Sequence, residues 1–218
     1  MTIEKKITKV VIVGAGSVGK FLAYNANQFT EAYEFIGFLD DDSNKQNQII
    51  AGIPVLGTTE KLPELVQQNT AIAWGIAFPK IKAQLVEKHK HLEAVFPSFI
   101  SKAAWISNEV KIGKGCIIYP GCSINYETQI GDFVVMNMNC ALGHNVTLGD
   151  FTSLAPGVNL GGYTIIGDRT DMGIGAATKQ FIEIAKGCVV GGQAMVTKSF
   201  PSDSIIKGVP AIQSENKK

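Results

Sequence analysis

The chain has one arginine, three histidines and no long apolar segment among its 218 residues. Its charges are also evenly divided along the sequence. Residues 1–97 carry ten lysines and ten acids, while residues 98–218 carry nine lysines, Arg169 and nine acids. A basic face of the kind that binds nucleic acid or an anionic membrane is therefore not expected.

The apolar run nearest the amino end, residues 7–13, is too short to cross a bilayer and leads directly into a glycine turn. It predicts a first strand and not a signal peptide, so we expect a cytoplasmic protein. Because 45% of the residues are hydrophobic, a chain of this length can form two modest domains, each with its own core.

The four cysteines do not have the spacing of a metal site or of a redox motif. They are separated by 6, 18 and 48 residues, without a CxxC pair or a neighbouring pair of histidines. We expect buried structural thiols of low reactivity. They are Cys116, Cys122, Cys140 and Cys188.

Residues 1–97 alternate strand and helix signals. The predicted order is a strand at 7–13, a glycine turn with a helix, a strand at 33–42 that ends in acids, a helix at 59–68, a strand at 70–77, a helix at 79–90 and a strand at 93–97. This alternation favours a Rossmann-like α/β domain, in which helices cover a small parallel sheet.

Every sixth residue from Ile100 to Val196 is apolar, with a single exception. Sixteen of the seventeen are aliphatic or methionine, and Thr178 is the exception. This period is typical of a parallel β-helix, in which three hexads make one triangular coil, and it predicts between five and six coils. Hexapeptide proteins resemble one another in winding left-handed, which implies the same hand here. The predicted domains are therefore 1–97 and 98–218.

The hexad pattern assigns side chains to the inside or the outside of the β-helix. All four cysteines fall on position five, which is a second inward position. His144 falls on position three, close to a corner, so its imidazole is expected to face solvent.

A GxGxxG turn follows the first predicted strand, and acids follow the second. Such glycines let the backbone approach a phosphate at the amino terminus of a helix. Asp40 stands where a dinucleotide site places its ribose-binding acid. The alternative is a tight turn without a ligand. The small size of the domain favours a single nucleotide over a dinucleotide.

His144 has two interpretations. It is either a surface histidine that caps a corner, or a general base that takes a proton from an amine or hydroxyl during attack on an acyl carbon. Gly143 beside it would allow a ligand to come close. Asn145 follows where a carboxylate could orient the ring, and Asn137 is expected to face the same groove.

His89 and His91 lie on a charged predicted helix and are expected to be solvated. A zinc site like that of hexapeptide-repeat carbonic anhydrases needs three histidines on neighbouring coils, and the repeats contain only one. No metal site is expected.

Glycine-rich turns in the later coils are either simple turns or one edge of a groove for an extended ligand, with Lys179 near its phosphates.

Together these motifs resemble those of a known family. The residues that carry the resemblance are the GxGxxG turn with FLDDD, Asn137 with His144, SLAPG at 153–157, GIGA at 173–176 and GVPA at 208–211. Over nearly its whole length the chain resembles the bacterial sugar acyltransferases, which include sialic acid O-acetyltransferases and the N-acetyltransferases of bacillosamine and perosamine pathways.

The resemblance implies a homotrimer with active sites between subunits, where acetyl-CoA lies between neighbouring β-helices and a nucleotide-linked amino sugar lies on the amino-terminal domain. It implies that His144 is the general base, and we predict that Asn137 and Asn145 are the catalytic residues that assist it. The implied nucleotide-sugar residues are Gly14, Gly16, Ser17, Gly19, Asp40 and Asp41. The implied acetyl-CoA residues are Gly162, Gly173, Gly175, Gly208, Val209 and Pro210. We add Ser153, Gly161, Ala176 and Lys179 as further candidates for the same site.

Two positions depart from the family pattern. Asn145 stands where many relatives have an acid, and Ser153 stands where many have a second histidine. An amide oxygen can hold the imidazole but stabilises an imidazolium less than a carboxylate does. Because an amine needs less help from a base than a hydroxyl, the sequence favours N-acetylation. The resemblance implies that the acceptor is a bacillosamine-type sugar linked to UDP. A sialic acid type O-acetyltransferase and a non-catalytic nucleotide-binding trimer are the alternatives.

Overall fold

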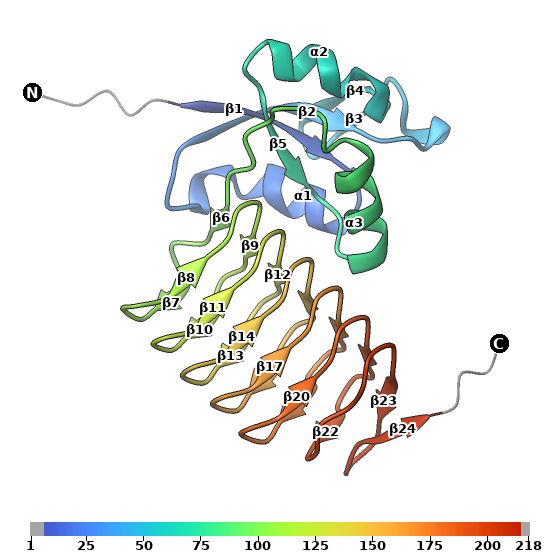
Figure 1. Cartoon of the computed structure of the whole chain (residues 1–218). Coiled ribbons are helices and arrows are strands. Elements are labelled where there is room, and N and C mark those ends of the chain that lie inside the picture. Colours follow the sequence, from blue (N-terminus) through green and yellow to red (C-terminus); the bar gives the residue numbers. More distant parts are fainter. Residues whose placement is uncertain (1–6, 215–218) are drawn as a thin grey trace, which may run out of the picture.

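A computed structural model describes residues 7–214, so the ends of the two predicted domains, 1–6 and 215–218, lie outside the described part. Figure 1 shows a small sheet with helices on both faces, followed by a stack of triangular coils. The fold class is the predicted one, a Rossmann-like domain joined to a left-handed parallel β-helix.

The amino-terminal sheet has the strand order β3-β4-β2-β1-β5. The inner strand β1 (Thr8–Val13) pairs in parallel with β2 (Tyr33–Leu39) and with β5 (Ala71–Trp74), and β4 (Ile53–Gly57) pairs with the other side of β2. Val10 to Val13 are buried because β1 is covered on both sides. The remaining elements are β3 (Ile49–Ile50), α1 (Ser17–Tyr24), α2 (Leu62–Gln67), α3 (Pro79–Lys88) and the 3-10 turns η1 (Ala26–Gln28), η2 (Ser43–Lys45) and η3 (Thr59–Lys61).

The predicted strand at 93–97 is wrong. Val95 makes one backbone contact with the sheet, in which its carbonyl accepts a hydrogen bond from Ile72 N–H at 2.9 Å. The next carbonyl, that of Phe96, already accepts from Gly115 N–H in the first coil at 3.0 Å. The segment is the crossing between the two domains, and Pro97 has no N–H with which to continue a ladder.

The prediction that His89 is solvated is also wrong. His89 is the residue at which α3 ends, and the chain turns there so that the imidazole packs towards Trp74, with ring centroids 6.2 Å apart. Its exposed fraction is 8%, and burial followed by the charge of Lys88 lowers the pKa of His89. His91 is exposed, as predicted.

The β-helix follows the hexad count without an offset. Each of the seventeen strands from β6 to β22 is two residues long and ends on a residue of the sixfold series. The strands are β6 (Phe99–Ile100), β7 (Trp105–Ile106), β8 (Lys111–Ile112), β9 (Ile117–Ile118), β10 (Ser123–Ile124), β11 (Gln129–Ile130), β12 (Val135–Met136), β13 (Ala141–Leu142), β14 (Thr147–Leu148), β15 (Ser153–Leu154), β16 (Asn159–Leu160), β17 (Ile165–Ile166), β18 (Asp171–Met172), β19 (Ala177–Thr178), β20 (Glu183–Ile184), β21 (Val189–Val190) and β22 (Met195–Val196).

Three faces result from the stacking of these strands, and Figure 1 shows them side by side. The first face contains β7, β10, β13, β16, β19 and β22, and the second contains β8, β11, β14, β17 and β20. The third face begins with β6, β9 and β12 and ends with β23 (Ile205–Lys207) and β24 (Ile212–Ser214), which pair antiparallel. We call the corner between the first and second faces the histidine corner, because it contains His144.

The corners share one backbone conformation. Position four of every hexad from 109 to 193 has a positive φ between 55° and 75°, although only five of these residues are glycine. A left-handed residue costs energy for other side chains, yet it lets each corner turn identically. Residues 18 apart therefore lie one above the other, which places Tyr126, His144 and Gly162 in one column of the histidine corner.

The interior of the β-helix consists of the sixfold series and position five. All four cysteines are buried in this interior, as predicted, and burial raises the pKa of the Cys116 thiol to about 11. The amino-terminal domain covers the start of the third face, where Ile117 and Val135 join its core. Phe21 of α1 stacks on Tyr119 at a centroid distance of 3.6 Å, so the two domains are packed against each other.

Candidate active site

A cleft of about 380 Å³ opens at the carboxyl ends of β1, β2 and β5. Ligands of open α/β sheets bind at this edge. Gly14, Gly16 and Ser17 line one side of the cleft, and Phe78 and Ile81 at the start of α3 line another. The structure therefore brings the predicted glycine turn to a hollow of the size of a small-molecule site.

The three glycines of the turn have different roles. Gly14 has φ +96° and lines the cleft, and Gly16 has open space where a side chain would lie. Gly16 precedes α1, whose first N–H groups have no intrahelical partner and can bind an anion. Gly19 is not a lining residue. A Cβ there would collide with the Gly14 carbonyl oxygen, so Gly19 allows α1 to pack closely on the turn.

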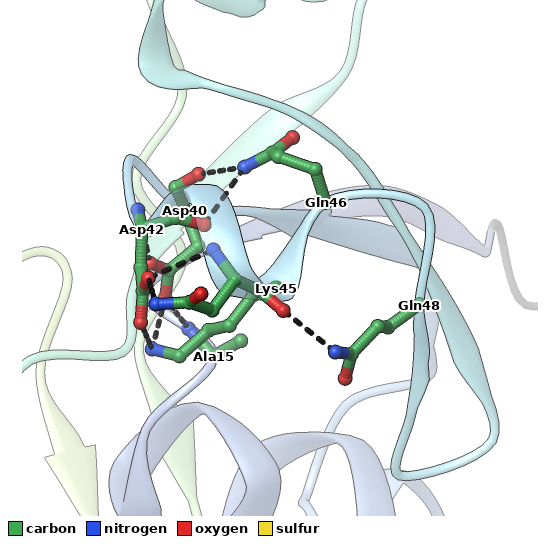
Figure 2. A network of polar contacts seen from close by, with 7 residues as sticks. Ala15, Asp40, Asp42, Lys45, Gln46 and Gln48 are labelled. Atoms are coloured by element: carbon green, nitrogen blue, oxygen red, sulfur yellow. Dashed lines mark hydrogen bonds and ion pairs between the residues drawn. The ribbon is translucent and has the colours of Figure 1, made fainter.

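Asp40 connects the glycine turn to the end of β2 (Figure 2). Its carboxylate accepts hydrogen bonds from Ala15 N–H at 2.8 Å, from Lys45 Nζ at 2.9 Å and from Asp42 N–H at 3.0 Å. Burial opposes ionisation, but the bonds from Lys45 and the two backbone groups hold the pKa of Asp40 below its usual value. Asp40 thus lines the cleft with its carboxylate already engaged.

Asp41 also holds the cleft wall. Its two carboxylate oxygens accept from Thr59 N–H at 2.8 Å and from Thr59 Oγ1 at 3.1 Å, which fixes η3 beside β2. Lys45 was missed at the sequence level because it lies in a short loop without a motif. It supplies a positive charge to the cleft, where a phosphate would otherwise meet three acids.

His144 lies in the histidine corner with its ring between two tyrosines. Tyr126 stacks on the imidazole at 5.3 Å with an interplanar angle of 8°, and Tyr163 meets it edge-on at 5.0 Å. A Cβ on Gly162 would be 3.0 Å from Nε2, and one on Gly143 would be 2.6 Å from Gly162 N. Both glycines are therefore needed for the ring and the next coil to approach each other.

A chain of hydrogen bonds holds the imidazole from its Nδ1 side. Nδ1 lies 2.9 Å from Asn145 Oδ1, as the sequence analysis anticipated for the amide. Asn145 Nδ2 in turn donates to Glu127 Oε2 at 2.6 Å. Glu127 was not predicted from the sequence. The period could have identified it, because Glu127 precedes Asn145 by 18 residues and so occupies the equivalent place in the preceding coil.

Most of the predicted acetyl-CoA residues lie along the two edges of the first face of the β-helix. The prediction had placed them along a single edge. Gly161, Gly162 and Lys179 lie in the histidine corner, beyond one edge. Gly173, Gly175 and Ala176 lie at the opposite corner, and the 208–210 turn lies beside β22, where Met195 N–H donates to Gly208 O at 3.0 Å. Ser153 is separate, because it lies on the third face with an exposed fraction of 6%.

Asn137 does not have its expected position, and the N–H of Gly161, a predicted acetyl-CoA residue, is already hydrogen-bonded. Gly161 N–H donates to Thr178 O at 3.3 Å and lies 3.1 Å from Thr178 Oγ1, so it is not free to stabilise an oxyanion. Gly162 N–H has no acceptor within residues 7–214. Asn137 lies across the first face from His144, and its Oδ1 accepts from Met138 N–H at 2.8 Å. One subunit does not bring Asn137 and His144 together.

No helix between residues 7 and 214 is long and apolar enough to cross a membrane. Within the same range, His, Cys, Asp and Glu residues form no group of three or more that could hold a metal ion.

Comparison with known proteins places the amino-terminal part of the chain in a known domain family. Residues 9–89 match the family model of the PglD N-terminal domain. No curated protein matches the chain in sequence. A histidine-to-asparagine variant of perosamine N-acetyltransferase from Caulobacter crescentus, in complex with CoA and GDP-perosamine, is 25% identical with a TM-score of 0.88, covering 95% of this chain and 97% of its own.

Two further solved structures are similar over almost the whole chain. The acetyltransferase domain of PglB from Neisseria gonorrhoeae FA1090, in complex with acetyl coenzyme A, is 26% identical with a TM-score of 0.70, covering 96% of this chain and 100% of its own. WeeI from Acinetobacter baumannii AYE is 26% identical with a TM-score of 0.84 and the same coverage. The expected resemblance to bacterial sugar acyltransferases is confirmed.

Proposed function

We propose that this chain, which has the fold and the amino-terminal domain of the hexapeptide-repeat sugar N-acetyltransferases, transfers the acetyl group of acetyl-CoA to an amine of a nucleotide-linked amino sugar. The observation that carries the proposal is the arrangement of the histidine corner. His144 is held at Nδ1 by Asn145, and its Nε2 has no hydrogen-bond partner in residues 7–214. The backbone of Gly162, whose N–H also has no acceptor in these residues, packs closely against the ring.

The chemistry follows from these three groups. The neutral sugar amine attacks the thioester carbon, and Nε2 of His144 accepts the amine proton as the carbon–nitrogen bond forms. The Gly162 N–H stabilises the oxyanion of the tetrahedral intermediate. When the carbon–sulfur bond breaks, the imidazolium returns the proton to the CoA thiolate. The step requires no covalent acyl-enzyme.

The amino-terminal cleft is the proposed site of the nucleotide. Phe78 is 65% exposed and Ile81 is 49% exposed where they line the cleft, so they offer apolar surface to a base. The first turn of α1 and Lys45 offer N–H groups and positive charge to a diphosphate. On the basis of the family resemblance we propose UDP as the nucleotide and a bacillosamine-type 4-amino sugar as the acceptor, and we propose that the enzyme acts in the cytoplasm.

An active site shared between subunits of a homotrimer is part of the proposal. The cleft and α3 lie towards the third face, whereas His144 lies at the opposite corner. Tyr126 and Tyr163 are each 46% exposed and Phe181 is 69% exposed, so an aromatic row along the histidine corner is uncovered in one subunit. A second copy would cover this row and bring its own Asn137 side of the first face towards His144.

We expect sedimentation equilibrium to give a trimer. Changing Phe181, at the exposed end of the aromatic row, to aspartate is expected to weaken assembly and to lower activity in proportion to the loss of trimer. The matched control is Val95→Asp, because Val95 is also an exposed apolar residue (66% exposed) and lies in the 93–97 segment away from the aromatic row. A fully active monomer would contradict the shared site.

Acetyl transfer itself is tested by measuring CoA thiol release and product mass with a panel of acceptors. Thiol release and a mass gain of one acetyl group are expected with UDP-linked 4-amino sugars, and to a smaller extent with GDP- and dTDP-linked ones. Release only with hydroxyl acceptors would indicate an O-acetyltransferase. The absence of release with every acceptor would indicate a nucleotide-binding module and refute the proposal.

A further inference from the structure

We infer that Glu127 selects the tautomer of His144 by fixing the direction of the Asn145 amide. Glu127 touches neither substrate nor the imidazole, so it is a positioning residue. Its consequence for activity depends on the proposed function, but its effect on the tautomer does not.

The selection follows from which groups can donate. A carboxylate only accepts hydrogen bonds, so the Asn145 atom that faces Glu127 at 2.6 Å must be the amide nitrogen. The amide oxygen is then directed at His144 Nδ1, 2.9 Å away. Since that oxygen can only accept, Nδ1 must carry the hydrogen, which leaves the lone pair of a neutral ring on Nε2. Nε2 is the atom that the reaction needs as a base.

Without Glu127 the amide could turn by half a rotation. The amide nitrogen would then donate to Nδ1, and the hydrogen of the neutral ring would move to Nε2, where it would block proton transfer. Asparagine therefore differs from the acid that many relatives have at this position, because a carboxylate cannot present a donor to the ring. An asparagine needs a second group to define its direction.

The β-helix holds these residues in a fixed register. Glu127 and Asn145 both occupy position four of a hexad in adjacent coils, with φ values of 55° and 57°. The coils are tied directly beside them, because Asn145 N–H donates to Tyr126 O at 3.0 Å. Tyr126 stacks flat on the imidazole, which limits rotation of the ring. The amide is the remaining group whose direction is not set by the backbone.

The charge of Glu127 has a second effect. Its carboxylate is one amide away from the imidazole, so it stabilises the imidazolium that forms when the sugar amine is deprotonated. Glu127 thereby supplies, from the preceding coil, the negative charge that Asn145 lacks.

Nitrogen-15 NMR of labelled protein measures the tautomer without any substrate. At high pH, where imidazoles are neutral, we expect the His144 signals of a ring protonated on Nδ1, assigned by their loss in His144→Ala. In Glu127→Ala both tautomers are expected. In Glu127→Lys the ammonium would donate to the amide oxygen, turn the amide and place the hydrogen on Nε2. Glu109→Ala, which changes the same corner one coil earlier, should leave the signals unchanged.

Activity provides a second measurement. Glu127→Ala is expected to lower kcat about tenfold with little change in the KM for acetyl-CoA, and Glu127→Lys is expected to lower it further. The double variant Glu127→Ala with Asn145→Asp should recover activity, because a carboxylate against Nδ1 needs no orientation. An unchanged tautomer in Glu127→Ala would overturn the inference whatever the activity. Full activity of His144→Ala would instead contradict the proposed base and leave the NMR result valid.

Discussion

Replacing His144 by alanine is expected to lower kcat by roughly 10² or more, with binding of acetyl-CoA retained. The variant removes the only imidazole within residues 98–218 and with it the proposed base, against which Gly162 packs. Binding is retained because the glycine turns that frame the first face are unchanged. Steady-state kinetics and calorimetric titration with acetyl-CoA measure the two effects separately.

His91→Ala is the matched control for this change. His91 is exposed beyond the end of α3, so the same substitution there removes an imidazole without touching the histidine corner. We expect wild-type kcat from this variant. Wild-type kcat from His144→Ala would remove His144 from the mechanism, while a loss of acetyl-CoA binding would indicate that the ring supports the groove.

The sixfold period of the sequence predicted the strands of the β-helix closely, because the period arises directly from the burial of hydrophobic side chains. An inward aliphatic every six residues fixes where each strand ends, from Ile100 to Val196, and position five fixes the cysteines inside. The left-handed corner residues could not be predicted in this way. Residues such as Phe133 and Tyr163 have no intrinsic preference for positive φ, and they adopt it because the neighbouring coils turn there.

The wrong predictions share one cause. Each concerns tertiary contacts, which the local periodic pattern of the sequence does not describe. The linker at 93–97 resembles a strand locally but leaves the sheet after one hydrogen bond. His89 is on a charged helix by pattern, but the helix ends at that residue and the ring turns inward. Asn137 was placed with His144 because both positions are outward, although outward residues of different hexads belong to different corners.

Lys82 carries the largest expected effect on stability. It lies on α3, has an exposed fraction of 1%, and its Nζ has no hydrogen-bond partner in residues 7–214. Desolvation lowers the pKa of Lys82 to about 7, and the electrostatic interactions of Lys82 with Cys116 and Asp171 act in the opposite direction. An ammonium in this environment opposes folding. We expect Lys82→Met to be more stable than the wild type by on the order of 2 kcal/mol at pH 6.

The effect of pH on this difference has a defined sign. In the unfolded chain Lys82 keeps its proton up to about pH 10, whereas the folded chain releases it above about pH 7. Below pH 7 both states are protonated and the cost of the buried charge is fully present. As the pH rises above 7 the unfolded state binds more protons, so the wild type gains stability relative to Lys82→Met.

Denaturation midpoints of both proteins between pH 6 and pH 10, at equal protein concentration, measure the gain because other titrating groups cancel in the difference. Lys80→Met, an exposed substitution on the same helix, should show no such convergence. Burial raises the pKa of Asp171, and Lys82 partly offsets that rise, so the variant also removes a favourable neighbour from this carboxyl. A constant difference across this range would mean that the Lys82 ammonium is solvated or paired in the folded protein, which would contradict its burial without a partner.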